Sequence, residues 1–577
     1  MENLELKKEE SEEKESSIKD KEESNNSIGE IEKRKNKLKS IFLGWIQDNY
    51  DKVFLIVLVI ALIIRFLIFL NTMNQPLWYD TASYLATARQ WGLGLNLHDI
   101  WYYRRGFFWP LFSAIFFKIG LGEVAIRFTG VLFSTGIVFV SYFLIKEMFN
   151  KKIALGVTIS LAVSWILLFF TPRPLTDIPA AFFILTSLLF FWKGYIKSQG
   201  NKFIYISGIF FALTVMTRMQ SLMFAPSFLI AVFLKEKFRF LKNKYLWISL
   251  LLFLIVLSPN LYVYSMHYGN PIKDILTYNL GIGGAPNSAV SGKNFSSILN
   301  YIKDLPYEIT SNLSTHSYYY FITRIFFIVF LTGIFFFFID LVLGFDKIFK
   351  NKELQTKLFI LSWILIPFLV LGYLAPAVEQ RYMTATLPFL FLIPIFLIFS
   401  TESLILQKTK LSKRTVLIIL FLILIIFLVP NYVWGKQLIE FKKTSYAEVK
   451  EAGLWLKENT DPNAIILSDS EPQIQYYSGR STYSINRNES DFEDQIKELK
   501  PDYLILSIYE QSPDWAFSYP EAHPEVLKAI YGIPPNQQAN TVIYKFEQTT
   551  EPLGEKILEA AEKTKEILDS KNSTNSS

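Results

Sequence analysis

Long apolar runs recur through this sequence, and one of the clearest, KVFLIVLVIALIIRFLIFLN, occupies residues 52–71. About 20 apolar residues in a helix cross the roughly 30 Å hydrocarbon core of a bilayer. Because such a segment must satisfy its backbone hydrogen bonds internally, these runs predict membrane-spanning α-helices. We expect about eleven spans, near residues 52–71, 125–147, 153–171, 177–193, 203–218, 221–235, 245–265, 320–343, 356–375, 382–400 and 414–433.

The segments between the expected spans predict the orientation of the chain. Lysine and arginine near span ends are retained on the cytoplasmic side of a membrane. Every second connecting segment is rich in these residues, and the alternate segments are poorer in lysine. We therefore expect a cell-membrane protein with a cytoplasmic N-terminus and an extracytoplasmic C-terminal domain. The basic segments are 146–152, 193–202, 235–244, 345–357 and 407–414, and the long external segments are 72–124 and 266–319.

Composition divides the chain into four parts. Residues 1–45, rich in Glu, Lys and Ser, predict a disordered charged cytoplasmic tail, and residues 46–434 hold the spans. Residues 435–548 predict a small α/β domain, because they combine apolar residues at helical spacing with compact β-type runs such as AIILS and YLILSIY. Residues 549–577 read as a polar helix followed by a disordered tail.

Several kinds of site are excluded by composition. The chain has no cysteine, so it has no disulfide, thiolate metal site or cysteine nucleophile. Its four histidines lie far apart in the sequence, which disfavours a histidine metal cluster. Neither a P-loop nor a dinucleotide-binding glycine motif is present. The net charge of +6 comes largely from the short basic segments between spans, so we expect no nucleic acid partner.

Ionisable residues gather at the predicted outer ends of the spans. Ionisable groups at membrane depth are functional candidates when they face a cavity. Arginines hold phosphate groups through charge-assisted hydrogen bonds, and a carboxylate can accept a proton from a reacting hydroxyl. This combination predicts a site for a phosphate donor carried by a lipid. The candidates are Asp80, Arg104, Arg105, Asp177, Glu379, Arg381 and Tyr382.

Each candidate also has a purely structural alternative. Asp80 and Asp177 could cap the helices that begin beside them. The arginines of the first external segment could bind anionic lipid headgroups. Glu379 and Arg381 could form an ion pair at the interface with no role in chemistry.

Three motifs resemble the glycosyltransferase C superfamily. WYDTASYLATA follows the first span and contains Asp80, PLTDIPAAFF opens a span with Asp177, and Glu379-x-Arg381-Tyr382 precedes a proline at a later span. Their order is similar to the branch that holds the dolichyl-phosphate-mannose–protein mannosyltransferases and the lipid A aminoarabinose transferases. The resemblance implies a multi-pass α-helical membrane protein with a small external C-terminal α/β domain.

The resemblance also implies roles for the two aspartates and a basic residue. Asp80 matches the catalytic acidic position, acting as a base or orienting the acceptor. Asp177 matches a second carboxylate that supports the active site or a metal. Arg218, in VMTRMQS, occupies a place that is often basic in relatives. Asp80 is followed by Thr81, where protein mannosyltransferases usually carry Glu, which argues against transfer to protein hydroxyls.

For the donor, the resemblance associates Tyr382, together with Glu379 and Arg381, with the carrier phosphate. Arg104 or Arg105 would neutralise that phosphate. The metal question stays open: a divalent cation, if one is used, would be held by Asp80 and Asp177.

The expected function is therefore transfer of a hexosyl or pentosyl group from a polyprenyl phosphate carrier, dolichyl or undecaprenyl, on the outer face of the membrane. The acceptor is a lipid, a glycan or a protein, and a single displacement would invert the anomeric centre. Two other classes compete with this expectation. A transporter or flippase would show acids near the membrane midplane and internal symmetry, neither of which is visible, and a non-catalytic scaffold for surface glycan assembly would not need Asp80.

Overall fold

The computed structural model describes residues 49–274, 296–310, 319–374, 378–535 and 538–547. The predictions for the tails, residues 1–45 and 549–577, lie outside these residues. The chain divides into two units, Met1–Val59 and Ile60–Ser577. The candidate site and the C-terminal domain both belong to the second unit.

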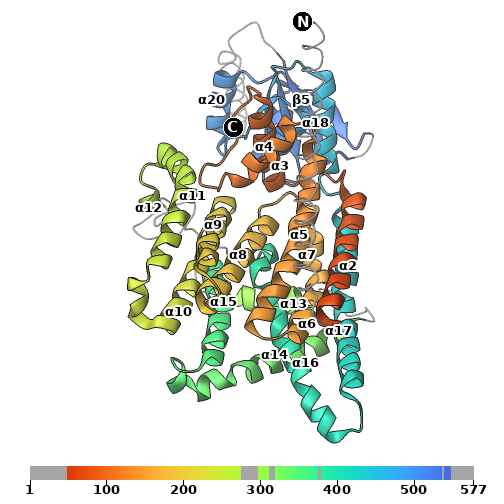
Figure 1. The fold of residues 1–577 in the computed structure, drawn as a ribbon. Coiled ribbons are helices and arrows are strands. Elements are labelled where there is room, and N and C mark those ends of the chain that lie inside the picture. Colours follow the sequence, from red (N-terminus) through yellow and green to blue (C-terminus); the bar gives the residue numbers. More distant parts are fainter. Residues whose placement is uncertain (1–48, 275–295, 311–318, 375–377, 536–537, 548–577) are drawn as a thin grey trace, which may run out of the picture. The chain divides into compact units, whose positions relative to one another are not determined.

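The described residues form a multi-pass helical membrane fold (Figure 1), which confirms the expected class. Eight helical stretches among them are long and apolar enough to cross a membrane. They are α2 (Asn49–Thr72), α5 (Gly122–Met148), α8 (Asp177–Phe191) with the π-helical turn η1 (Trp192–Ile196), α11 (Lys244–Tyr268), α14 (Tyr320–Leu343), α15 (Lys352–Leu374), η6 (Gln380–Thr386) with α16 (Leu387–Lys408), and α17 (Lys413–Lys442).

The span expected over 153–171 is broken into α6 (Lys151–Val163) and α7 (Trp165–Phe170). Ser164 between them has φ −57° and ψ 123°, outside the helical region. Asn431 of α17 occupies the break: its Oδ1 accepts from the backbone N–H of Trp165 at 3.5 Å, and its Nδ2 donates to the carbonyl of Ile309 at 2.9 Å. Irregular backbone is tolerated at membrane depth when protein surrounds it.

The spans expected over 203–218 and 221–235 are short helices, α9 (Asn201–Thr217) and α10 (Ala225–Glu236). With 17 and 12 residues they fall below the roughly 20 that a full crossing needs. The count of eleven spans is therefore not confirmed. Arg218, in extended conformation, ends α9, and the 3-10 turn η2 (Met219–Phe224) leads into α10. Two further 3-10 turns are η3 (Lys237–Lys242) and η5 (Phe345–Lys347).

Both long external segments expected from the sequence contain helices. Segment 72–124 contains α3 (Tyr79–Leu93) and α4 (Phe108–Lys118). The described residues of segment 266–319 contain α12 (Pro271–Asp274) and α13 (Ser296–Ile309). Ile298 of α13 packs against Gly372 of α15, at a distance that leaves no room for a Cβ on the glycine.

The C-terminal α/β domain, blue in Figure 1, has a five-stranded sheet of order β2-β1-β3-β5-β4. The strands are β1 (Ile465–Ser468), β2 (Ser481–Tyr483), β3 (Tyr503–Ser507), β4 (Leu527–Ile533) and β5 (Thr541–Phe546). β1 pairs in parallel with β2 and β3, whereas β5 pairs antiparallel with β3 and β4. α17 continues past residue 434, where we expected this domain to start. The domain's helices are α18 (Ala447–Asn459), α19 (Glu471–Ser478), α20 (Glu489–Leu499) and α21 (Asp514–Ala522).

Helices cover both faces of this sheet, because its central strands carry apolar side chains on each face. Ile466 and Ile505 pack with residues of α18 and α19, while Leu467 and Leu504 pack with residues of α20 and α21. Successive side chains of a strand point to opposite faces, so one compact apolar run supplies two cores. This arrangement confirms the predicted α/β domain.

Helix α19 of this domain holds the start of α3 in place. The hydroxyl of Tyr477 accepts from the backbone N–H of Leu77 at 2.8 Å, and Arg89 of α3 donates to the carbonyl of Tyr476 at 2.5 Å. Tyr476 also donates to Glu123 at the start of α5, at 2.8 Å. These bonds fix the segment that carries Asp80.

Candidate functional site

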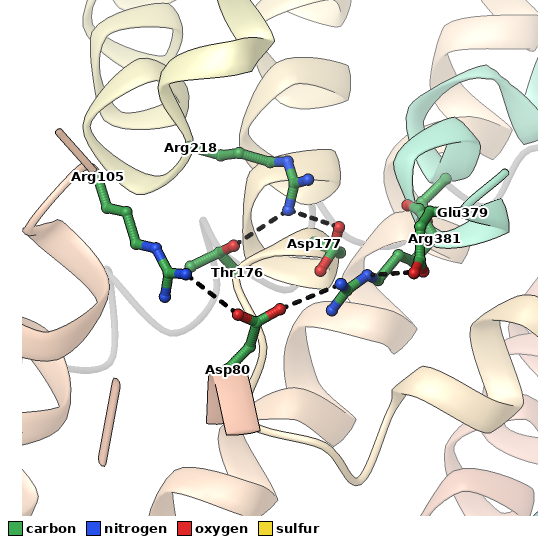
Figure 2. Close-up of polar contacts among 8 residues, drawn as sticks. Asp80, Arg105, Thr176, Asp177, Arg218, Glu379 and Arg381 are labelled. Carbon is green, nitrogen blue, oxygen red and sulfur yellow. Dashed lines mark hydrogen bonds and ion pairs between the residues drawn. The ribbon is translucent and has the colours of Figure 1, made fainter. Parts of the chain in front are cut away.

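Asp80 lies in the first turn of α3, and two arginines hold its carboxylate (Figure 2). Its Oδ1 accepts from Arg105 at 3.2 Å, and its Oδ2 accepts from Arg381 at 3.1 Å. The residue at the cap position is Trp78, which makes no side-chain cap hydrogen bond. The capping alternative for Asp80 is therefore wrong: the carboxylate serves a contact between segments 301 residues apart in the sequence.

The environment of Asp80 keeps it ionised. Burial pushes its pKa upward, but the charges of Arg105 and Arg381 outweigh this effect and hold the pKa below its ordinary value. A third of the side chain is exposed (33%), so a substrate can reach it. Asp80 is thus an accessible anion whose hydrogen-bonding capacity is shared with two cations.

Asp177 is the first residue of α8 and is nearly sealed, with its side chain 2% exposed. Its Oδ1 accepts from Arg218 at 2.7 Å, whereas its Oδ2 makes no hydrogen bond within the described residues. Arg218 also lies 3.4 Å from the hydroxyl of Thr176, the cap residue, which makes no cap hydrogen bond itself. Asp177 therefore acts here as the partner of a buried guanidinium, not as a helix cap.

Arg381 connects the two halves of the cluster. It lies in η6, where its Nε is 3.2 Å from Glu379 Oε2 while its Nη2 reaches Asp80. The Glu379–Arg381 ion pair, which was the structural alternative for these two residues, is present, and Arg381 contacts Asp80 as well. The ring of Tyr382 lies 4.3 Å from the Arg218 guanidinium and 5.4 Å from that of Arg381, within cation–π range.

These side chains surround a cavity of about 150 Å³. That is the volume of about five liquid waters, which suits a phosphate group better than a whole sugar phosphate. Three guanidinium groups and two carboxylates face it, so its charged lining is positive by one unit. Nη1 of Arg105 is buried and makes no hydrogen bond in the part of the chain described, which leaves one donor for an anion. The lining residues are Asp80, Tyr84, Arg105, Gly106, Leu175, Thr176, Asp177, Thr217, Arg218, Met219, Gln220, Arg381 and Tyr382.

Arg104, although adjacent to Arg105, does not join the cluster. Its Nε and Nη2 bind the two carboxylate oxygens of Asp274 at 2.8 and 2.9 Å. Its guanidinium also lies 3.9 Å from the ring of Tyr268. Most of the residues predicted from the sequence therefore lie together: Asp80, Arg105, Asp177, Glu379, Arg381 and Tyr382. Arg104 lies outside this cluster, paired with Asp274.

Several lining residues were missed from the sequence, among them Tyr84 and Gly106. Tyr84 is four residues after Asp80 on the same face of α3, and the guanidinium of Arg105 lies 5.5 Å from its ring. Gly106 is needed because a Cβ there would run into the carbonyl of Met216 at the end of α9. Two sequence signals could have identified them: Tyr84 follows Asp80 at the i, i+4 spacing of a helix, and Gly106 directly follows two arginines.

The charged groups do not form a metal site of ordinary composition. Within the described residues, no three His, Asp or Glu side chains gather as a set of ligands. Guanidinium groups occupy positions beside both Asp80 and Asp177. Because these arginines already supply positive charge there, we derive no step through a metal.

Comparisons with known proteins match this architecture. The sequence profile described as dolichyl-phosphate-mannose-protein mannosyltransferase matches residues 105–263. That range includes Arg105, Asp177 and Arg218. No curated protein matches the sequence.

Solved structures show the same fold at low sequence identity. ArnT from Cupriavidus metallidurans bound to undecaprenyl phosphate has a TM-score of 0.57 and 11% identity, over 87% of this chain and 98% of that one. The Archaeoglobus fulgidus oligosaccharyltransferase AglB, in complex with an inhibitory peptide and a dolichol-phosphate, has a TM-score of 0.55 and 15% identity, over 88% and 76%. Arabinofuranosyltransferase AftD from Mycobacteria has a TM-score of 0.50 and 11% identity, over 87% and 40%.

The fold, the profile match and the order of the three motifs agree with one another. Residues 105–263 therefore match the dolichyl-phosphate-mannose-protein mannosyltransferase profile, and the fold of this membrane protein is similar to the folds of ArnT, AglB and AftD.

Proposed function

We propose that this chain is a glycosyltransferase that moves a sugar from a polyprenyl phosphate carrier to an acceptor on the outer face of the cell membrane. The observation that carries the proposal is the pairing of Asp80 with two guanidinium groups in a cavity of net positive charge. The undecaprenyl phosphate and dolichol-phosphate bound to ArnT and AglB support this kind of carrier.

The carrier phosphate would bind between Arg105 and Arg381. Arg105 offers a buried Nη1 donor, and both guanidiniums can move hydrogen bonds from Asp80 to phosphate oxygens. Such charge-assisted bonds are about twice as strong as neutral ones. They strengthen as the bond between the anomeric carbon and the phosphate oxygen breaks, because its electron pair leaves with the phosphate.

Donor binding would then activate Asp80. The same two arginines hold its pKa below the ordinary value, so sharing them with a phosphate raises the basicity of the carboxylate when the donor is in place. The acceptor hydroxyl attacks the anomeric carbon and gives its proton to Asp80. A single displacement of this kind inverts the anomeric centre, and a product that kept the configuration of the donor would refute it.

A further role, positioning Arg381 against the carrier phosphate, would fall to Asp177, Arg218 and Tyr382. Nη1 of Arg218 lies 2.7 Å from Oδ1 of the buried Asp177, and the Arg218 guanidinium lies against the ring of Tyr382. Tyr382 in turn follows Arg381 directly in the chain. We expect this pair to fix the direction from which Arg381 approaches the phosphate.

The transferred sugar would be a hexosyl or pentosyl group, and the acceptor a lipid, a glycan or a protein. The test uses the purified full chain in lipid with a panel of labelled polyprenyl-phosphate sugars, and it measures release of the carrier phosphate. The variant is Asp80→Asn, and the matched control is Asp99→Asn, which alters an exposed aspartate of the same connecting segment that does not line the cavity. A parallel reaction contains EDTA.

We expect release by the parent and the control, at least 100-fold slower release by Asp80→Asn, and no loss in EDTA. Equal release by Asp80→Asn would remove Asp80 from the chemistry. No release from any donor by folded protein would favour the scaffold or the transporter alternative.

A further inference from the structure

A second cavity, of about 650 Å³, lies at the far end of α8 from the candidate site. The helical stretch Asp177–Ile196 begins in the site and ends at this cavity, 20 residues later. At 1.5 Å per residue the two ends are about 30 Å apart. No residue lines both cavities, so the second one serves neither Asp80 nor its arginines.

Three lysines stand around the mouth of this cavity. Lys197, Lys235 and Lys352 are exposed and come from three different segments. The ammonium group of Lys235 is held at the mouth by the hydroxyl of Ser198, at 3.2 Å, and by the carbonyl of Tyr195. The acidic residue in the described lining, Glu353, lies 3.2 Å from the buried Lys357, and Glu236 outside the lining acts on Lys235. The charged lining itself, three lysines and one glutamate, is positive by two units.

Two helix N-termini add to this positive charge. α6 begins beside the cavity at Lys151, where the Oδ1 of Asn150 caps the backbone N–H of Ile153 at 3.0 Å. α15 begins there at Lys352, and its first turn contributes Gln355 and Thr356 to the lining. The N-terminal end of a helix carries roughly half a positive charge and favours anions.

The inside of the cavity is apolar and contains one unused donor. Phe359, Ile153 and Leu234 line it and are 1%, 6% and 6% exposed. Trp192, in the π-helical turn η1, is 4% exposed, and its indole N–H has no partner in the described part of the chain. π-helical turns are rare and occur frequently at functional sites. A positive mouth above an apolar interior suits an amphiphile with an anionic head.

We propose that this cavity binds an anionic phosphate group, supplied by a membrane phospholipid. The lysines and the two helix N-termini hold the phosphate, and one acyl chain lies on the apolar interior beside Trp192. Free inorganic phosphate could bind the same lysines as the lipid phosphate, but it would make no contact with the apolar interior. The phospholipid is therefore the favoured source of the phosphate group. This site is independent of the proposed sugar transfer.

The test uses quenching of tryptophan fluorescence by brominated acyl chains, because bromine quenches an indole on contact. The full chain in zwitterionic mixed micelles is titrated with brominated phosphatidylglycerol or brominated phosphatidylcholine. The chain has 12 tryptophans, so the signal of Trp192 is the difference between the parent and Trp192→Phe. The site variant is Lys197→Gln with Lys352→Gln. The matched control, Lys347→Gln with Lys350→Gln, removes the same charge from exposed lysines that do not line the cavity.

We expect phosphatidylglycerol to quench Trp192 at lower concentration than phosphatidylcholine, and the site variant to need about tenfold more of it, with the control unchanged. Equal quenching by both lipids, or equal effects of the two double variants, would overturn the proposal. Competition by millimolar inorganic phosphate, with no quenching by either lipid, would establish free phosphate as the occupant and refute the lipid. Size-exclusion profiles verify that each variant is folded.

Discussion

Replacement of Arg218 by glutamine tests whether the deep half of the cluster contributes to stability as well as to function. The side chain of Asp177 is 2% exposed, and its Oδ2 makes no hydrogen bond among the residues described. Arg218, at 2.7 Å, is the cation that hydrogen-bonds to it, and Arg381 interacts with its charge without an ion-pair contact. Removing one partner of a buried ion pair typically lowers the free energy of unfolding by about 3–5 kcal/mol.

The matched comparison is Arg105→Gln. Its partner, Asp80, is 33% exposed and keeps Arg381 at 3.1 Å after the change. Pairs with this much solvent contribute about 0–1 kcal/mol. We therefore expect Arg218→Gln to lower the free energy of unfolding by at least about 2 kcal/mol more than Arg105→Gln does.

Both variants should lose sugar release, since Arg105 contacts the proposed phosphate position and Arg218 supports Tyr382. Unfolding of the purified protein in detergent, followed by tryptophan fluorescence, measures the difference in stability. Combining Arg218→Gln with Asp177→Asn removes the buried carboxylate that has lost its hydrogen-bonding cation, and it should recover most of the lost stability without restoring activity. Equal free energies of unfolding for the two single variants would refute the burial argument.

Three further predictions follow from the charges. The charges of Arg105 and Arg381 hold the pKa of Asp80 below its ordinary value in the free protein, so kcat/KM should fall only below about pH 4, as pH drops through the lowered pKa. The turnover number kcat should fall at a higher pH, because in the donor complex the two arginines also bind the phosphate. If kcat and kcat/KM fell at the same pH, the proposal that Asp80 shares its arginines with the phosphate would be wrong. Burial, and to a lesser extent the charge of Asp469, raises the pKa of Glu471 to about 7, so folding favours its neutral form and the free energy of unfolding declines as pH rises from 4.5 to 7. Glu471→Gln should therefore increase the free energy of unfolding at pH 8 by about 3 kcal/mol. A free energy of unfolding of the parent that does not change between pH 5 and 8 would refute this. Arg104→Gln should leave sugar release within a few-fold of the parent, because Arg104 binds Asp274 outside the cavity; a loss as large as that of Arg105→Gln would show that the two arginines act together.

Local sequence determined the class of fold and most of the candidate residues. Apolar runs such as 52–71 must become helices in a membrane, because no water is present to satisfy their backbone groups. The two-sided apolar strands after α17 predicted the α/β domain. Asp80, Asp177 and Arg381 stood out because charged groups near membrane depth are rare without a function.

Tertiary structure decided which of these groups meet. Arg104 and Arg105 are identical side chains on adjacent residues, yet one binds Asp274 and the other Asp80. The next residue, Gly106, approaches the carbonyl of Met216 at the end of α9 too closely for a Cβ, which is a contact between distant segments. The break between α9 and α10 that brings Arg218 to Asp177, and the meeting of Asp80 with Arg381, likewise depend on packing between segments, which local hydrophobic periodicity does not encode.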